Sequence, residues 1–262
     1  MGLLDQIWGN KNFQFFFERL RTLAMKGMNY GRASDYAHNG EPEVIRRVAA
    51  IVGTPSTVLF DVGANKGQFT NHVMDAWLGM SYQLYAFEPS KKTFEILQRS
   101  FPISPFVHFY NVGFGEKPGQ VELYYDHAGS GLASVYPRDL SHRQIDFSEH
   151  ETIELTTLDI FCKENGIACI DFLKMDVEGH ELAVLKGATQ LLSEGKIKII
   201  QFEFGGCNID SRTFFRDYYN FFKDKFKLFR VLSNGLRPIE AYSEKLEVFQ
   251  SANYVAIRRD LA

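Results

Sequence analysis

Acidic residues and glycines stand directly after two apolar, strand-like segments of the sequence. The stretch 61–67 (DVGANKG) follows the first segment, and Glu88 follows the second. Glycine has no Cβ, so the backbone at Gly63 and Gly67 can turn tightly and approach a ligand closely. An acid in the position of Glu88 can accept hydrogen bonds from both ribose hydroxyls of a nucleoside. Together the two segments predict a turn that holds a nucleoside.

The surroundings of this turn narrow the choice of ligand. The glycine spacing is not the GxGxxG of a dinucleotide fold, and no Gly-Lys-Ser/Thr follows as in a Walker loop. Asp61 is placed to help hold an ammonium group. A ribose and an amino-acid ammonium without a phosphate are parts of S-adenosylmethionine, which is therefore the predicted cofactor. The alternative is a tight turn beside an incidental acid.

The stretch 176–181 (DVEGHE) is the second candidate for chemistry. Asp176 is expected to reach over the sheet edge, where it would both contact the cofactor and act in catalysis. Asp176 or His180 could accept the proton of a hydroxyl substrate. Glu203, near the end of a later strand, is the second carboxylate expected at the site. Glu178 could cap backbone amides, and Glu181 is expected to be structural, as an acid in the first turn of a helix.

A divalent metal is an alternative for part of this set. Asp176, His180 and Glu203 together offer ligands that suit magnesium or calcium, and a metal would activate a hydroxyl directly. Their spacing in the sequence is not diagnostic, so no metal is predicted.

Strand-like and helix-like patterns alternate along most of the chain, which predicts a doubly wound α/β fold with a mostly parallel sheet. Ligands of such sheets bind beyond the carboxyl ends of the strands. The expected strands are 57–62, 82–87, 106–112, 170–175, 197–204, 226–232 and 254–257. The expected helices are 43–52, 68–78, 91–99, 181–192 and 213–223.

An insertion, roughly 119–157, interrupts this alternation. Its segments 121–125 and 152–155 alternate in polarity and could pair as antiparallel strands. Between them lies the small-residue stretch 129–134 (GSGLAS), which we interpret as part of a lid over the active edge, with an ordinary surface loop as the alternative. Ser134 of this stretch is an expected cofactor contact.

Composition excludes several classes of protein. The 262 residues carry a net charge of −3, with a pI near 6.2, so nucleic acid is a poor candidate partner. Three cysteines without CxxC spacing, and a start that does not resemble a signal peptide, favour the cytoplasm. Since no stretch reaches the roughly 20 apolar residues of a membrane span, no transmembrane segment is expected.

Residues 1–40 are expected to form a helical extension, and residues 41–262 the main domain. Phe13, Phe15, Phe16, Phe17 and Leu20 crowd this extension, with basic residues close behind. We expect a helix that packs on the main domain or on a second subunit, which would allow a homo-oligomer. The alternative is an amphipathic helix that lies on a membrane or grips another partner.

These motifs in combination resemble the FkbM family of methyltransferases. The matching stretches are 61–67, then 85–89 (YAFEP), 111–113 (NVG), 173–181 (LKMDVEGHE) and 184–188 (VLKGA), within a resemblance that covers about 41–257. The resemblance implies a Rossmann-like class I methyltransferase sheet of seven strands, the last one antiparallel. It also implies site roles: the methionine part beside Gly63, Asn65 and Gly67, the ribose on Glu88, and the adenine near Asn111 and Val112.

The function predicted from these features is S-adenosylmethionine-dependent O-methylation. The preferred acceptor is a sugar hydroxyl of a glycan or glycosylated metabolite. Tyr124, Tyr125 and Tyr136 near the lid could stack on sugar rings or could equally be core residues. A polyketide or other secondary-metabolite hydroxyl is the alternative acceptor. A non-catalytic binding protein that keeps the fold is the hypothesis from another class.

Overall fold

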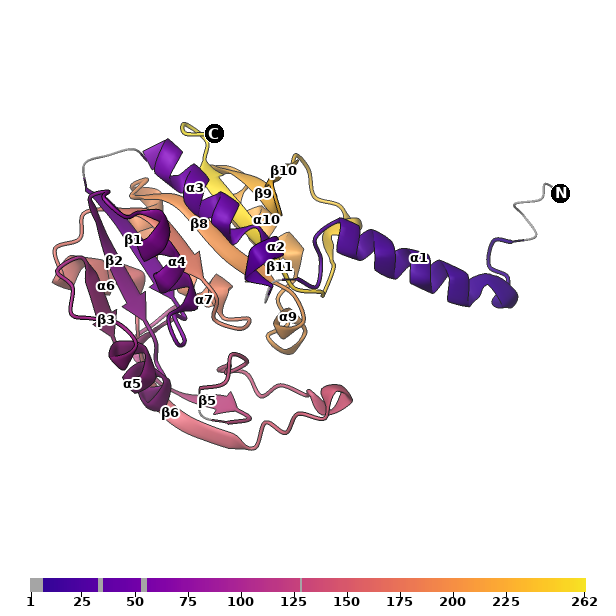
Figure 1. The fold of residues 1–262 in the computed structure, drawn as a ribbon, viewed down its shortest axis with the longest axis horizontal. Coiled ribbons are helices and arrows are strands. Elements are labelled where there is room, and N and C mark those ends of the chain that lie inside the picture. Colours follow the sequence, from indigo (N-terminus) through magenta and orange to yellow (C-terminus); the bar gives the residue numbers. More distant parts are fainter. Residues whose placement is uncertain (1–6, 33–34, 53–55, 128) are drawn as a thin grey trace.

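The computed structural model describes residues 7–32, 35–52, 56–127 and 129–262. In this part of the chain, a sheet of eight strands forms the centre of the protein (Figure 1). From one edge to the other, its strands are β10 (Gly235–Ile239), β9 (Phe226–Leu232), β11 (Ala252–Arg258), β8 (Ile197–Phe204), β7 (Ile170–Met175), β1 (Thr57–Val62), β2 (Tyr82–Phe87) and β3 (Val107–Tyr110).

The pairing of these strands confirms a Rossmann-like methyltransferase sheet. The strands from β8 to β3 pair in parallel, whereas β11 is antiparallel to both β8 and β9. All seven expected strands are present. The eighth, β10, was not expected, because Pro238 interrupts the strand pattern. It forms a hairpin with β9 at the sheet edge, where a proline does not remove a ladder hydrogen bond.

Helices cover both faces of the sheet. Neighbouring strand residues point to opposite faces, so Leu59 packs in one hydrophobic cluster and Phe60 in the other. One face carries α3 (Glu41–Val52), α4 (Gln68–Ala76) and α5 (Lys91–Arg99), and the other carries α6 (Leu158–Glu164), α7 (Glu181–Lys186), α8 (Thr189–Ser193) and α10 (Phe215–Phe222). The other short helices in the described ranges are α2 (Tyr36–Asn39), α9 (Cys207–Asp210) and the 3-10 turns Lys11–Phe13, Ser141–Arg143 and Glu244–Leu246.

The expected helix 181–192 is wrong as a single element. The chain forms α7 and α8 with a break at Gly187 and Ala188. A Cβ at Gly187 would lie 2.1 Å from the carbonyl oxygen of Gly115. The helix breaks where this other backbone segment approaches closely. The apolar periodicity of the sequence does not report such an approach, so the break was not predicted.

A second sheet of three strands lies beyond the carboxyl edge of β2. It consists of β4 (Gly113–Phe114), β5 (Gly119–Tyr125) and β6 (Glu149–Thr156). The expected antiparallel pairing inside the insertion is confirmed, with Val121 opposite Ile153. The strand β4 was not expected, and it pairs in parallel with β6.

The helix α1 (Gln14–Gly27) extends away from the rest of the protein (Figure 1). Every residue of α1 is exposed or half-buried, and Met25 is its one side chain that packs against the described core, so α1 does not pack along its length on the main domain. Packing on a second subunit, the other part of the expectation, stays a prediction. In the part of the chain that is described, no helix combines the length and the apolar character needed to cross a membrane.

Candidate active site

Two connected hollows open where β1, β2 and β7 end. The inner cavity, about 70 Å³, lies between these strand ends and the three-stranded sheet. The outer cleft, about 1210 Å³, runs from there past the start of α4 to α2. The two hollows share Gly63, Asn65, Gly131, Asp176 and Glu178 as lining residues, so they meet at these residues.

The glycine turn after β1 forms part of both walls. Gly63 has a φ of 79°, and a Cβ there would lie 2.0 Å from the carbonyl oxygen of Asp176. Gly67 has a φ of 85°, and a Cβ there would meet the ring of Phe101 at 2.3 Å. Other parts of the protein therefore leave no room for a side chain at either position, whether or not a ligand is bound.

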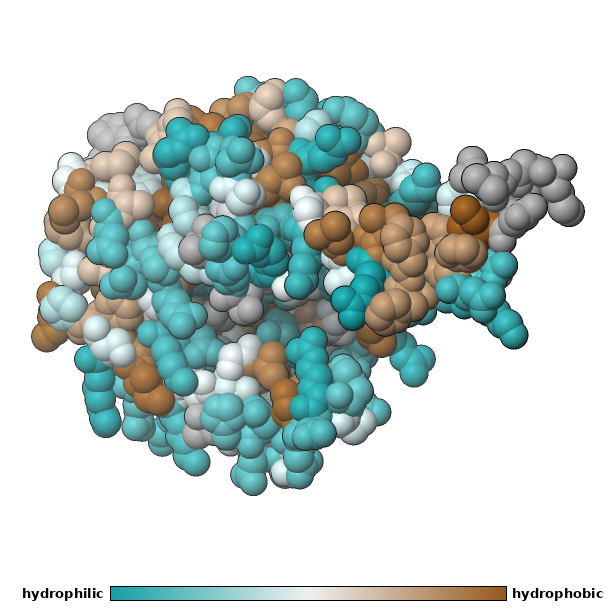
Figure 2. Space-filling model, turned by 45° about the vertical axis from the view of Figure 1, so that its right-hand side comes forward, coloured by the Kyte–Doolittle hydropathy of each residue, from teal (hydrophilic) through white to brown (hydrophobic). Residues whose placement is uncertain are grey.

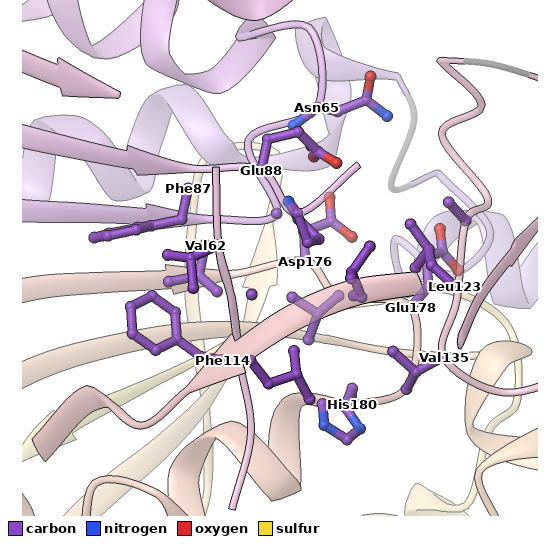
Figure 3. A pocket seen from close by; sticks show the side chains of 18 of the residues that line it. Val62, Asn65, Phe87, Glu88, Phe114, Leu123, Val135, Asp176, Glu178 and His180 are labelled. Carbon is purple, nitrogen blue, oxygen red and sulfur yellow. The ribbon is translucent and has the colours of Figure 1, made fainter. Parts of the chain in front are cut away.

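Glu88 and Asn65 lie together at one end of the inner cavity (Figure 3). The Glu88 carboxylate accepts hydrogen bonds from the backbone N–H of Asn65 at 2.9 Å and of Ser90 at 3.0 Å. Burial raises the pKa of Glu88 to about 7, although these two hydrogen bonds oppose the rise. The Asn65 side chain donates to the carbonyl oxygen of Ser130, which connects the turn to the insertion.

Of the two residues expected beside adenine after β3, Asn111 and Val112, one lies in the cavity wall. Val112 lines the inner cavity. The Asn111 side chain is exposed, and its amide donates to the carbonyl oxygens of Glu88 and Pro89, each at 2.9 Å. Asn111 therefore holds the end of β2 in place.

Asp61 was expected to help hold the ammonium group of the cofactor, but it lies inside the protein and not in the wall of either hollow. Its side chain is completely buried, and it accepts a hydrogen bond from the Thr70 hydroxyl at 2.8 Å. The other carboxylate oxygen lies 3.3 Å from the Lys174 ammonium group. The cation beside Asp61 is thus a side chain of the protein.

Lys174 connects Asp61 to Asp176. Its ammonium group lies 3.5 Å from the Asp176 carboxylate, and the Asp176 side chain is 42% exposed. Burial alone would lower the pKa of Lys174, but the two carboxylates raise it above its usual value. Sequence reasoning missed Lys174, although a lysine inside the buried strand β7 is itself a signal of an ion pair.

Glu178 is held by a residue that sequence reasoning also missed. The buried Arg138 guanidinium lies 2.6 Å from the Glu178 carboxylate and 3.4 Å from that of Asp210. Burial, together with the negative charge of Asp176, raises the pKa of Glu178 to about 8. The Ser134 hydroxyl donates to the Glu178 carbonyl oxygen at 2.8 Å. Ser134 and Arg138 therefore attach the insertion to the loop after β7.

His180 lines the inner cavity at the end opposite Glu88, with Asp176 between them (Figure 3). Its Nδ1 lies 3.0 Å from the Tyr136 hydroxyl. Burial lowers the pKa of His180 to about 4, so the ring is neutral at pH 7. His180 is thus a partly buried residue of the cavity wall.

Glu203 lies in the wall of the outer cleft with Glu41 and Asp176. Burial and the negative charges of Asp176 and Glu178 raise the pKa of Glu203 well above its usual value. Burial also raises the pKa of Glu41, which accepts a hydrogen bond from the Gln201 amide at 3.1 Å. Among the described residues, no group of three or more His, Cys, Asp or Glu side chains could hold a metal ion.

The aromatic residues expected near the acceptor lie elsewhere. Tyr125 packs in the core of the small sheet, Tyr124 lies against His150, and Tyr136 bonds His180. The aromatic side chains that line the outer cleft are instead Tyr36, Phe69, Phe101 and Phe249.

Comparisons with known proteins agree with this architecture. The family described as "Methyltransferase FkbM domain" matches residues 61–230. The 2-O-methyltransferase NoeI of Sinorhizobium fredii (strain NBRC 101917 / NGR234) is 24% identical over 58% of this chain and 65% of its own length.

Several solved structures are distantly similar to the chain, including the following two. Methyltransferase FkbM from Methylobacillus flagellatus KT has a TM-score of 0.46 and 19% identity, over 77% of this chain and 44% of that one. TrmK of M. capricolum, in complex with S-adenosyl-homocysteine, has a TM-score of 0.41 and 11% identity, over 82% and 68%. The chain spans less than two thirds of the length of NoeI and less than half of the FkbM structure.

Proposed function

Because this chain belongs to the FkbM family of S-adenosylmethionine-dependent methyltransferases, we propose that it methylates a sugar hydroxyl bound in the outer cleft. The observation that carries the proposal is the meeting of the two hollows at Asp176. If the nucleoside part of the cofactor lies in the inner cavity and the acceptor lies in the outer cleft, the two molecules adjoin each other at Asp176.

The inner cavity has the chemistry that S-adenosylmethionine requires. The Glu88 carboxylate faces it as an acceptor for ribose hydroxyls, and Val112, Phe114 and Leu155 supply apolar walls for the adenine ring. Bound there, the cofactor supplies an electrophilic methyl group on a sulfonium.

The outer cleft favours a sugar over a polyketide because its wall combines several carboxyl groups with aromatic rings. Glu41, Asp176 and Glu203 offer carboxyl groups that can hydrogen-bond several hydroxyls, and the rings of Tyr36 and Phe101 offer flat apolar faces. A polyketide has fewer hydroxyls to donate to the carboxyl oxygens that face the cleft, which is unfavourable once water is displaced. The name of the relative NoeI, a 2-O-methyltransferase, supports an oxygen acceptor.

Asp176 is the residue placed to act on the acceptor. Its partly exposed carboxylate can accept the proton that the hydroxyl loses, while Lys174 holds it from behind. Glu203 and Glu41, whose pKa values are raised, are suited to hold other hydroxyls of the same sugar. His180 lies at the far end of the inner cavity from Glu88. Because its ring is neutral, it is suited to contact the cofactor rather than the acceptor.

A methyl-transfer assay with radiolabelled cofactor tests the proposal on mono- and oligosaccharides and on polyketide aglycones. We expect label only in the sugars. Asp176→Asn should lower kcat by about 10²-fold or more and change cofactor affinity little; the exposed Asp224→Asn is the matched control. Full activity of Asp176→Asn would remove Asp176 from the mechanism, and label only in the aglycones would overturn the sugar assignment. Cofactor binding without transfer to any acceptor would favour a binding protein.

A further inference from the structure

The helix α1 carries a stripe of apolar side chains that the rest of the chain leaves uncovered. The stripe follows helical spacing, and on the space-filling surface apolar side chains gather on this projecting element (Figure 2). Phe16 is 60% exposed, Leu20 49% and Leu23 69%. Trp8 precedes the helix, stacks on Phe17 and is itself exposed. Together these side chains form the α1 stripe: Trp8, Phe16, Phe17, Leu20 and Leu23.

An exposed patch of this kind marks a binding surface, because a single protein rarely leaves adjoining large apolar side chains in water. With 14 residues, α1 is only about 21 Å long, too short for a membrane span. A partner must therefore cover α1 from the side, along its length.

Charge identifies that partner. The stretch 7–28 holds four basic residues and one acidic residue, a net charge of +3 within a chain whose net charge is −3. At 100° per residue, Arg19 and Arg21 fall on opposite flanks of the α1 stripe. Two such helices side by side would bring like charges together, whereas an anionic lipid surface complements both the stripe and its flanks.

We propose that α1 lies flat on an anionic membrane surface, with the α1 stripe in the lipid and the arginines at the headgroups. This inference is independent of the methyl acceptor. It has a consequence for the site, because Gly31 follows α1 closely, donates its N–H to the Ser251 carbonyl at 2.8 Å and lines the outer cleft with Ser251. Attachment through α1 thus places the mouth of the outer cleft near the lipid.

Vesicle sedimentation of the full-length protein tests the proposal. We expect binding to vesicles of phosphatidylcholine mixed with phosphatidylglycerol, weaker binding to phosphatidylcholine alone, and release at high salt. Leu20→Glu should weaken binding about tenfold or more, since it removes a large apolar side chain from the lipid. The control Leu78→Glu changes a residue that is 88% exposed but lies outside α1, and should bind as the wild type does.

A second pair of variants isolates the charge. Arg19→Gln with Arg21→Gln should weaken binding to the anionic vesicles about thirtyfold, from about 1 kcal/mol per basic residue at such a surface. Lys92→Gln with Lys163→Gln makes the same charge change at exposed positions outside α1 and should have little effect. All variants should keep the wild-type thermal unfolding temperature, because none of these side chains is buried.

Three results would overturn the proposal. The first is a wild-type protein that stays in solution with both kinds of vesicle. The second is equal vesicle binding by Leu20→Glu and Leu78→Glu. The third is a dimer in sedimentation velocity that Leu20→Glu dissociates while vesicles bind no protein, which would make a second copy of the chain the occupant of the α1 stripe.

Discussion

The affinity for the cofactor should depend on pH through the carboxyl group of Glu88. This group is buried at the inner cavity, where burial raises its pKa to about 7. Its oxygens already accept hydrogen bonds from the backbone N–H groups of Asn65 and Ser90. Ribose hydroxyls would donate to the same oxygens, so the cofactor binds the ionised form better.

The size of the effect follows from this pKa. At pH 6, one unit below the pKa, about a tenth of the Glu88 carboxyl groups are ionised, against about nine tenths at pH 8. If only the ionised form binds well, the Kd should be about tenfold higher at pH 6 than at pH 8. The direction is fixed, because lowering the pH protonates an acceptor that binding requires.

Calorimetric titration with S-adenosyl-homocysteine at pH 6, 7 and 8 measures this dependence. Glu88→Gln should bind weakly and with a flat profile, while the exposed Glu116→Gln should keep the wild-type profile. A flat profile in the wild type would refute the reasoning. An unchanged slope in Glu88→Gln would assign the dependence to another group, such as Glu178, which lines the same cavity and also has a raised pKa.

Three further outcomes are expected. Lys174→Met should destabilise the fold by about 3–5 kcal/mol in urea unfolding, because it leaves the buried Asp61 carboxylate without its cation. The control Lys163→Met, at an exposed position, should have little effect. Equal stability of the two variants would contradict this reasoning. Burial raises the pKa of Glu181 to about 7 and that of Glu178 to about 8, so the folded state retains protons that the unfolded chain releases from about pH 4.5 upward. Their contribution to stability is therefore full below about pH 4.5 and is lost as the pH rises to about 8, and a free energy of unfolding that increases over this range in urea titrations would disprove it. Treatment with a chelator should leave methyl transfer unchanged, and activity that is lost on chelation and returns with added magnesium would show that a metal is needed.

Much of the site could be predicted because its signals are local. Strands show apolar runs, and a doubly wound sheet brings their carboxyl ends to one edge, so Glu88, Asp176 and Glu203 could be assigned to that edge from their positions alone. The glycine turn is local as well, since Gly63 and Gly67 adopt a positive φ that other residues rarely take.

Side-chain partners could not be predicted in this way, because they come from distant parts of the chain. Nothing near Asp61 in the sequence shows that Lys174 would be its cation, and nothing near Glu178 shows that Arg138 of the insertion would hold it. The same holds for α1, whose composition suits packing equally well on its own domain, on a second copy or on a membrane.

The sequence by itself determined the order of the seven expected strands and the placement of acids and glycines at the strand ends, since periodicity and backbone preference act over a few residues. Only the tertiary structure decided that Asp61 faces Lys174, that Asp176 stands where the inner cavity meets the outer cleft, and that α1 leaves its apolar stripe uncovered. These features depend on which surfaces meet when the chain folds, and burial then sets the charge state of Glu88, Glu178 and His180.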